Sequence, residues 1–258
     1  QVSAESGKPD SGLLTQDRFR ADFNAICAAG QKLSEGCTAI RARRLVSPAN
    51  MPWRAIGRLN FASIDIRQHC TGTLVGERVV LTASHCLYSA ARKRWIPPSS
   101  LTFAAGYRQG SALTAARGVR YVLDPVQDPS SRDFRAGPAQ DWALVLLDSP
   151  IGREVGVLSL SDRQGGVVLA GYSALRPHVL SVAEDCGEWR MGTDWQVGLV
   201  HCSTMHGDSG APILIETANG PKLIGVLSTL GTDSEQTVWS VAVPSTTFMP
   251  ALEEMLAQ

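Results

Sequence analysis

The sequence predicts an all-β fold of antiparallel barrels or sandwiches, and two observations support this. From residue 52 onward, short apolar or alternating runs recur, and Gly, Pro, Asp and Ser separate them. Almost no segment between these runs has the periodicity of a helix. Many short strands with turn residues between them are typical of these two architectures.

The expected strands fall into two sets along the chain. The first covers residues 53–59, 70–75, 78–82, 101–105, 118–123 and 142–147, and the second covers residues 167–172, 178–183, 197–201, 211–215, 222–229 and 237–243. Two helices are expected outside the strands. Residues 13–29 carry apolar side chains near helical spacing, and the tail STTFMPALEEMLAQ repeats that pattern.

Composition excludes several functional classes. The chain has 258 residues, of which 44% are hydrophobic and 19% are charged, so it can bury a core. Its 24 Lys and Arg residues balance 24 Asp and Glu residues, which argues against binding to nucleic acid or a membrane surface through bulk charge. No apolar run reaches the roughly 18 residues of a membrane span. The first residues are polar and show no signal peptide, although Gln1 could follow one already removed.

The six cysteines favour disulfides over a metal site. They form three couples that are local in sequence: Cys27 and Cys37, Cys70 and Cys86, Cys186 and Cys202. An even count is typical of complete pairing, and none of the couples has the C-x-x-C spacing of a zinc or redox site. We therefore expect a secreted or periplasmic protein, because disulfides persist in oxidising compartments. No bound metal and no cofactor are expected.

Three strings could carry chemistry: LTASHC at 81–86, DWALVLLD at 141–148 and HGDSGAP at 206–212. In the last, small neighbours surround Ser209, as a nucleophile on a tight turn requires. The backbone N–H groups of Gly207 and Ser209 could then stabilise an oxyanion. The alternative is that this segment is an ordinary turn.

A serine needs a base, and the base needs an acid to orient it. His85 closely follows an apolar strand and directly precedes Cys86, so it is expected at a rigid strand end. Asp141 precedes the apolar run 142–147, where its carboxylate would be partly desolvated. Taken singly, His85 could lie beside a cysteine by chance, and Asp141 could cap a strand.

Taken together and in order, these strings resemble the chymotrypsin-like serine protease family over residues 45–257. TASHC resembles the T-A-A-H-C box of the family, DWALV its D-I-A-L box, and HGDSGAP its G-D-S-G-G-P box, with Ala211 for the last glycine. The order His, Asp, Ser also matches. The resemblance implies two antiparallel Greek-key β-barrels of six strands each, with a C-terminal helix and a short helical N-terminal segment.

The resemblance also implies domains and roles. Residues 1–44 would be a head, 45–150 a first barrel with His85 and Asp141, and 151–258 a second barrel with Ser209. A monomeric serine endopeptidase would use this triad, through an acyl-enzyme, to cut proteins or peptides. CTGTLV at 70–75 resembles the family strand whose cysteine pairs with the one after the histidine, which implies the Cys70–Cys86 disulfide. The Cys186–Cys202 couple fits the bacterial branch, including relatives of the glutamyl endopeptidases.

RARR at 41–44, followed by Leu45 and Val46, resembles the activation site of trypsin-like enzymes. There, a new amino terminus pairs with the aspartate before the nucleophile, here Asp208. We hypothesise that another protease removes residues 1–44 as a prosegment, tied by Cys27–Cys37, by cutting after Arg44. The alternative is a permanent head with a solvated basic run.

Substrate preference follows from the same resemblance. Ser203 occupies the base of the specificity pocket, with Thr204 beside it, and Ser228-Thr229-Leu230 lines the wall. No acidic residue stands at the base to receive Arg or Lys. Leu227 replaces a histidine usual in glutamyl specialists, so we expect a preference for uncharged, small-to-medium residues. A catalytically silent binding protein on this fold, or an esterase with a similar triad, remains the alternative.

Overall fold

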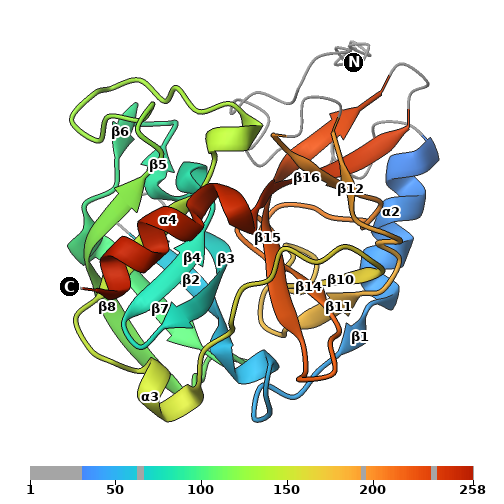
Figure 1. Cartoon of the computed structure of the whole chain (residues 1–258), viewed down its shortest axis with the longest axis horizontal. Helices are drawn as coiled ribbons and strands as arrows, with labels where there is room; N and C mark the ends of the chain where they lie inside the picture. The colour runs from blue at the N-terminus through green and yellow to red at the C-terminus, as the bar shows by residue number, and fades with distance from the viewer. Residues whose placement is uncertain (1–30, 63–66, 193–195, 234–236, 258) are drawn as a thin grey trace, which may run out of the picture.

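The structure, a computed structural model, describes residues 31–62, 67–192, 196–233 and 237–257. The expected helix at 13–29 and Cys27 lie outside these ranges. Within them, antiparallel strands build two units side by side (Figure 1). The predicted all-β class is therefore confirmed, and each of the twelve expected ranges overlaps a strand of the structure.

The first unit is a closed barrel with the strand order β2-β3-β4-β9-β8-β7. Its strands are β2 (Ile56–Ala62), β3 (Arg67–Gly76), β4 (Val79–Thr82), β7 (Leu101–Ala105), β8 (Thr114–Leu123) and β9 (Ala143–Leu147). All neighbouring strands run antiparallel. The pairing places Leu81 of β4 opposite Leu144 of β9, so the ends of these two strands lie together.

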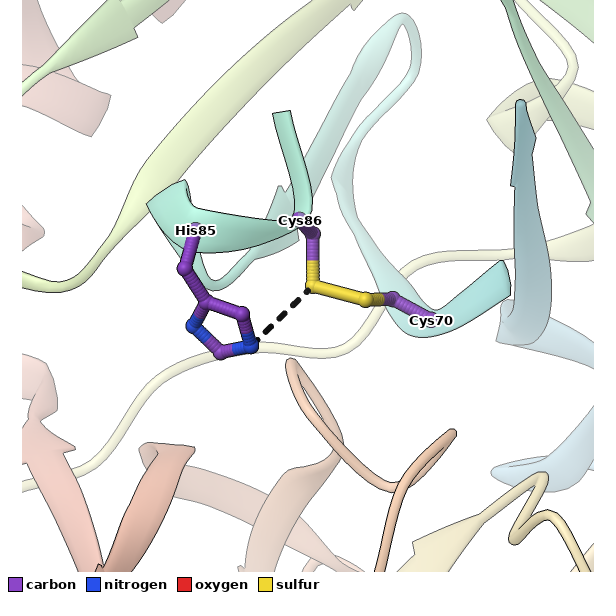
Figure 2. Close-up of side chains that lie close together, drawn as sticks. All are labelled: Cys70, His85 and Cys86. Atoms are coloured by element: carbon purple, nitrogen blue, oxygen red, sulfur yellow. Dashed lines mark hydrogen bonds between the residues drawn. A yellow bond between two sulfur atoms is a disulfide. The ribbon is translucent and has the colours of Figure 1, made fainter. Parts of the chain in front are cut away.

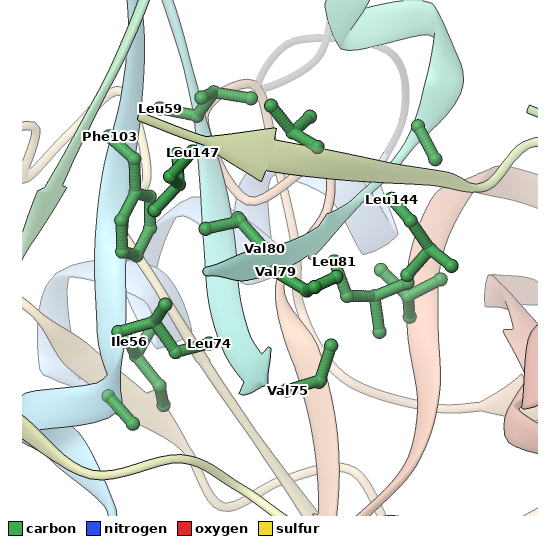
Figure 3. Close-up of a cluster of buried hydrophobic side chains, with 14 of the residues drawn as sticks. Ile56, Leu59, Leu74, Val75, Val79, Val80, Leu81, Phe103, Leu144 and Leu147 are labelled. Atoms are coloured by element: carbon green, nitrogen blue, oxygen red, sulfur yellow. The ribbon is translucent and has the colours of Figure 1, made fainter. Parts of the chain in front are cut away.

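Branched aliphatic side chains fill this barrel around the ring of Phe103 (Figure 3). Leu74, Val80 and Leu144 are fully buried there. Gly57 gives the ring its space, because a Cβ at that position would lie 2.5 Å from Phe103 Cζ. The barrel thus forms a rigid wall that holds the strand ends in place.

The second unit is an antiparallel sheet with the order β1-β11-β10-β14-β15-β16-β13-β12. Six of its strands match the expected second set: β10 (Val167–Gly171), β11 (Ser181–Ala183), β13 (Gly198–Val200), β14 (Pro212–Ile215), β15 (Lys222–Thr232) and β16 (Val238–Pro244). The two-residue strands β1 (Arg44–Leu45) and β12 (Arg190–Met191) extend it at either edge. The pairing of β15 with β16 shifts register between Leu227 and Thr229, which sets Ser228 at an irregularity.

The segment before residue 45 is joined to this sheet rather than standing apart from it. Helix α2 (Gln31–Ala42) buries Cys37 and Ile40, and β1 then pairs with β11. Figure 1 shows α2 along the outer side of the unit. The boundary drawn between residues 44 and 45 therefore falls inside β1. The N-terminal helix expected from the sequence ends at Gly30, and α2 was not predicted, although Leu33, Cys37 and Ile40 have helical spacing.

The smaller elements connect and cover the units. Helix α4 (Ser245–Leu256) confirms the expected C-terminal helix and crosses the first barrel (Figure 1), where the Phe248 ring lies 6.2 Å from that of Trp142. The remaining elements are α3 (Gly152–Val155), the hairpin of β5 (Tyr88–Ser89) and β6 (Arg94–Trp95), and the 3-10 helices η2 (Trp53–Ala55), η3 (Ser84–Leu87), η4 (Pro98–Ser100) and η5 (Pro138–Gln140). Of these, η3 carries His85 and η5 ends next to Asp141.

Candidate active site

The first barrel brings His85 and Asp141 together. His85 follows β4 and Asp141 precedes β9, and the pairing of these strands extends to Thr82 opposite Ala143. His85 Nδ1 lies 2.6 Å from Asp141 Oδ2, and the backbone N–H of His85 donates to Oδ1 at 2.9 Å. With Nδ1–H directed at the carboxylate, Nε2 is left as the basic nitrogen of the ring.

The Asp141 carboxylate is buried and held on both oxygens. Besides His85, it accepts the hydroxyls of Ser84 at 2.8 Å on Oδ1 and of Ser228 at 2.6 Å on Oδ2. Burial acts to raise the pKa of Asp141, but the charge of His85, with hydrogen bonds from His85 and Ser228, outweighs it and lowers the pKa. The carboxylate is therefore ionised at neutral pH and can orient the imidazole.

The loop that carries Ser209 packs against the first barrel. The backbone N–H of Thr71 donates to the Ser209 carbonyl at 2.9 Å. Gly210 approaches so closely that a Cβ there would lie 2.2 Å from Thr82 Oγ1. Since Thr82 ends β4 shortly before His85, these contacts hold the serine loop against the strand that leads to the histidine. Ser209 and His85 are both nearly buried, at 6% and 7% exposure.

The Cys70–Cys86 disulfide fixes the same corner (Figure 2). It joins β3 to η3, and His85 Nε2 lies 3.9 Å from Cys86 Sγ. Cys70, His85 and Cys86 lie within the reach of a shared metal ion, but thiolates bind metals and these sulfurs are already bonded to each other. The cluster thus offers His85 alone and does not fit a metal site. The second disulfide that the structure describes joins Cys186 to Cys202, and Cys27 of the third expected pair lies outside the described residues.

The backbone around Gly207 has the form that an oxyanion site needs. Gly207 has φ +88°, and a Cβ there would lie 2.2 Å from the Tyr172 carbonyl oxygen, so glycine is required. Thr71 Oγ1 donates to the Gly207 carbonyl at 2.7 Å, which fixes the peptide that joins Gly207 to Asp208. Among the described residues, neither the Gly207 nor the Ser209 backbone N–H donates to a protein acceptor. Both are available to a ligand.

Asp208, between those two residues, is paired with Arg43. The guanidinium contacts both carboxylate oxygens at 2.9 Å, and the side chains are 2% and 0% exposed. Arg43 Nη2 also donates to the Ser203 carbonyl at 2.6 Å, and the Met205 N–H donates to Asp208 Oδ2 at 3.1 Å. One buried cation thus joins the residue before the nucleophile to the expected base of the pocket.

Leu45, the residue expected to pair with Asp208 after cleavage, lies elsewhere. Its position in β1 pairs it with Ser181, and it is 51% exposed. Arg44, the expected cleavage site, forms an exposed ion pair with Glu184 at 2.8 Å. In the uncleaved chain, the place next to Asp208 is therefore held by Arg43 and not by Leu45.

Two of the predicted pocket residues, Thr204 and Leu230, lie next to Ser240 of β16. Thr204 Oγ1 lies 2.9 Å from Ser240 Oγ, and Leu230 pairs with Ser240 across the sheet. Thr229 is buried beside Leu230, and its hydroxyl donates to the Leu230 carbonyl at 3.3 Å. Ser228, predicted on the pocket wall, directs its hydroxyl to Asp141 instead. The irregularity in β15 turns it toward the first barrel.

Sequence reasoning missed several residues that hold the site. The Ser84 hydroxyl donates to Asp141 and accepts a hydrogen bond from Gln127 Nε2 at 3.2 Å. No role was expected for Ser84, although it stands next to His85 in the motif. Asp185 accepts the Ser203 N–H at 3.2 Å. No role of its own was expected for Arg43 within the RARR run, whether that run is a cleavage site or a solvated basic segment. Only the proximity of Ser84 to a motif was a signal in the sequence, because the other contacts join distant segments.

Solved structures share this fold. A Glu endopeptidase in complex with MPD has a TM-score of 0.61 at 19% identity, covering 84% of this chain and 97% of that chain. The thermostable serine protease AL20, from an extremophilic microorganism, has a TM-score of 0.56 at 17% identity, covering 77% of this chain and 96% of that one. These likenesses confirm the chymotrypsin-like fold that the motifs implied.

Sequence relatives agree with the fold. The human transmembrane protease serine 5 is 30% identical over 155 residues, 55% of this chain and 29% of that protein. The glutamyl endopeptidase of Bacillus licheniformis is 23% identical over 237 residues, 84% of this chain and 66% of that protein. The matches thus span less than a third of the human relative and just under two thirds of the bacterial one. The family model for Trypsin matches residues 46–252, most of the chain, and the chain therefore belongs to the trypsin family of serine proteases.

Proposed function

We propose that the protein is a serine endopeptidase that uses His85, Asp141 and Ser209. The observation that carries this proposal is the buried Asp141 carboxylate, which is 2.6 Å from His85 Nδ1 and leaves Nε2 as a base. The Ser209 loop packs on the first barrel, through the Thr71 N–H on β3 and through the close approach of Gly210 to Thr82, which ends the strand that leads to that histidine. A base, its orienting acid and a serine on a tight turn are the parts that acyl transfer requires.

In the proposed mechanism, His85 Nε2 takes the Ser209 hydroxyl proton as Oγ attacks the scissile carbonyl. Asp141 stabilises the imidazolium that forms, and the N–H groups of Gly207 and Ser209 stabilise the oxyanion. The intermediate collapses to an acyl-enzyme when His85 returns the proton to the leaving amine. Water, deprotonated by His85, then releases the acid product and restores Ser209.

We propose a preference for uncharged, small-to-medium residues before the cleaved bond. The Bacillus relative is named a glutamyl endopeptidase, which makes glutamate the second candidate. Leu227, however, stands where glutamyl specialists usually carry a histidine, and this apolar side chain offers no hydrogen bond to an acidic residue of the substrate. A peptide-library profile dominated by glutamate, or by arginine or lysine, would contradict the proposal.

We propose that the protein acts as a monomer outside the reducing cytosol, as a secreted or periplasmic enzyme. The two disulfides support this location, because such bonds persist in oxidising compartments. No helix among the described residues is long and apolar enough to cross a membrane. The contacts of Arg43 argue against removal of residues 1–44 by another protease, because Arg43 is itself the partner of Asp208.

A serine-directed fluorophosphonate probe tests the proposed activity. The intact chain and a Ser130→Ala control, altered at an exposed loop serine, should be labelled and should cut a casein substrate. Ser209→Ala should lose both signals, because it lacks the attacking oxygen. A catalytically silent binding protein would not be labelled in any form, and a Ser209→Ala variant that still cuts casein would reject the assigned nucleophile.

A further inference from the structure

Arg43 and Asp208 form a buried ion pair that the proposed mechanism does not use. An unpaired carboxylate with 0% exposure would be very unfavourable. The guanidinium meets both of its oxygens at 2.9 Å in a two-pronged contact, which is the geometry that arginine matches best. Asp208 is therefore held in one position by Arg43.

This contact fixes the loop that carries the oxyanion donors. Asp208 stands between Gly207 and Ser209, and its carboxylate also accepts the Met205 N–H at 3.1 Å. The same guanidinium binds the Ser203 carbonyl at 2.6 Å. The residues from the pocket base to the nucleophile thus share one cationic anchor, and a displacement of Asp208 would move the N–H groups on either side of it.

The other titratable groups near Asp208 cannot replace Arg43. His69 lies beside the loop, where a Cβ on Gly207 would be 2.6 Å from its Nε2. Burial, more than the nearby charge of Arg58, lowers the pKa of His69 to about 4, so this histidine is neutral at neutral pH. Burial raises the pKa of neighbouring Tyr172, which is also neutral.

The uncleaved main chain delivers Arg43 to this position. Residue 43 links α2 to β1, and its N–H donates to the Ile40 carbonyl at 3.4 Å. Leu45, on β1, and Gly171, on β10, both pair with Ser181 of β11, from opposite sides. A Cβ on Gly171 would lie 2.3 Å from Asp208 Oδ1. Two strand spacings, about 10 Å in all, therefore separate the Leu45 backbone from the strand that Asp208 touches.

We propose that Arg43 is a positioning residue, and that the uncleaved chain is the active form because its guanidinium holds Asp208 and, through it, the oxyanion donors. This inference rests on the proposed endopeptidase function. A Leu45 ammonium could reach Asp208 only if β1 left β11 and Arg43 left the site. Cleavage after Arg44 is then not the activating step.

Three variants of the full chain test this role. Arg43→Ala should lower kcat by about 100- to 1,000-fold, the cost of losing an oxyanion donor, with a smaller change in KM. Arg43→Lys should restore part of kcat, because it returns the charge without the two-pronged contact. Arg44→Ala is the matched control: its exposed ion pair contributes little, so kcat should change less than twofold.

The pH profile separates positioning from mere stability. A guanidinium stays charged through the alkaline range, whereas an α-amino group loses its charge near pH 8. Wild-type activity should therefore show no loss near pH 8 of the kind that an α-amino anchor for Asp208 would cause. The lysine of Arg43→Lys can lose its proton: its ordinary pKa is about 10.4, and in this site the Asp208 charge raises the pKa while burial lowers it. The activity of the variant relative to wild type should therefore fall at alkaline pH, as the ammonium is deprotonated. Near Asp208, neither His69 nor Tyr172 changes charge in the range of this test, because burial lowers the pKa of His69 to about 4 and raises the pKa of Tyr172 above its ordinary value near 10.

Labelling of Ser209 decides between the possibilities. Intact chain, verified by mass to include Arg43, should react with the fluorophosphonate as fast as chain cut after Arg44, or faster. Labelling only after that cut would overturn this inference and leave the proposed function standing. No labelling in either form would overturn both. If Arg43→Ala does not fold, as judged by thermal unfolding, the pH profile of Arg43→Lys decides, and a profile parallel to wild type would refute the role.

Discussion

Replacing Ser228 by alanine would remove one of the donors that hold the Asp141 carboxylate. The Ser228 hydroxyl is 2.6 Å from Oδ2, and the residue is 2% exposed. A hydrogen bond to a charged group contributes about 1.5–3 kcal/mol to stability, so the free energy of unfolding should fall by about that amount at pH 7. Two donors from His85 and one from Ser84 remain, so kcat/KM should fall less than tenfold.

The loss should depend on pH in a defined direction. The pKa of Asp141 is lowered in the folded protein, so the ionised carboxylate stabilises the fold above its unfolded pKa of about 3.9, and this contribution disappears as pH falls through the folded pKa. The difference between wild type and Ser228→Ala should therefore be full at pH 7 and shrink in acid. Urea unfolding followed by tryptophan fluorescence at several pH values measures it.

Ser245→Ala is the matched control for this measurement. Ser245 is 1% exposed, and its hydroxyl donates to the neutral Ser161 carbonyl at 2.7 Å, away from the site. Ser245→Ala should lower the free energy of unfolding by about 0.5–1.5 kcal/mol, and this difference should not vary with pH. If Ser228→Ala costs no more than Ser245→Ala, or costs as much in acid as at pH 7, the Asp141 carboxylate does not depend on this donor.

Two further predictions concern the disulfides and His69. The Cys70–Cys86 and Cys186–Cys202 bridges each close a separation of 16 residues. Replacing either pair by alanines should therefore lower the free energy of unfolding by a similar amount, about 3 kcal/mol on the chain-entropy account. Urea unfolding of the two double variants measures this, and a negligible loss in one of them would contradict the prediction. The pKa of His69 is lowered to about 4, chiefly by burial, so its ring-proton NMR signals should not titrate between about pH 5.5 and 8, and the stability it contributes as a neutral ring should decline as pH falls from about 6.5 through 4. A His69 midpoint near 6.5 would show that the ring is not buried as described.

The longer strands could be predicted because their pattern of apolar and polar residues is local in the sequence. In β2, Leu59 and Phe61 are buried while Arg58 and Asn60 are less so, and this alternation of apolar and polar residues can be seen in the sequence without knowing the neighbouring strands. Two-residue strands such as β1 carry no period at all. They exist only because a neighbouring strand accepts them, and for that reason the sequence missed them.

The residues of the site also differ in how far the sequence predicts them. His85, Asp141 and Ser209 each stand in a short motif whose neighbouring residues indicate a role. Arg43 has no such motif around it. Three arginines of the RARR run differ only in their surroundings: Arg41 and Arg44 are exposed and Arg43 is buried. Nothing within the run shows which arginine is buried, because that depends on the contact with Asp208, which lies far along the chain. Ser228 is similar, since its direction depends on an irregularity in a strand pairing.

Two buried carboxylates stand on either side of the proposed chemistry, and their partners differ in a way that suits the two tasks. Asp141 is held against His85, a group whose proton must come and go during each turnover. Asp208 is held against Arg43, whose planar guanidinium binds both of its oxygens in a fixed two-pronged contact. In the proposed mechanism, the first pair moves a proton while the second keeps the oxyanion donors fixed. Exchanging these properties would disable the site, since a titrating anchor would release the loop whenever it lost its proton.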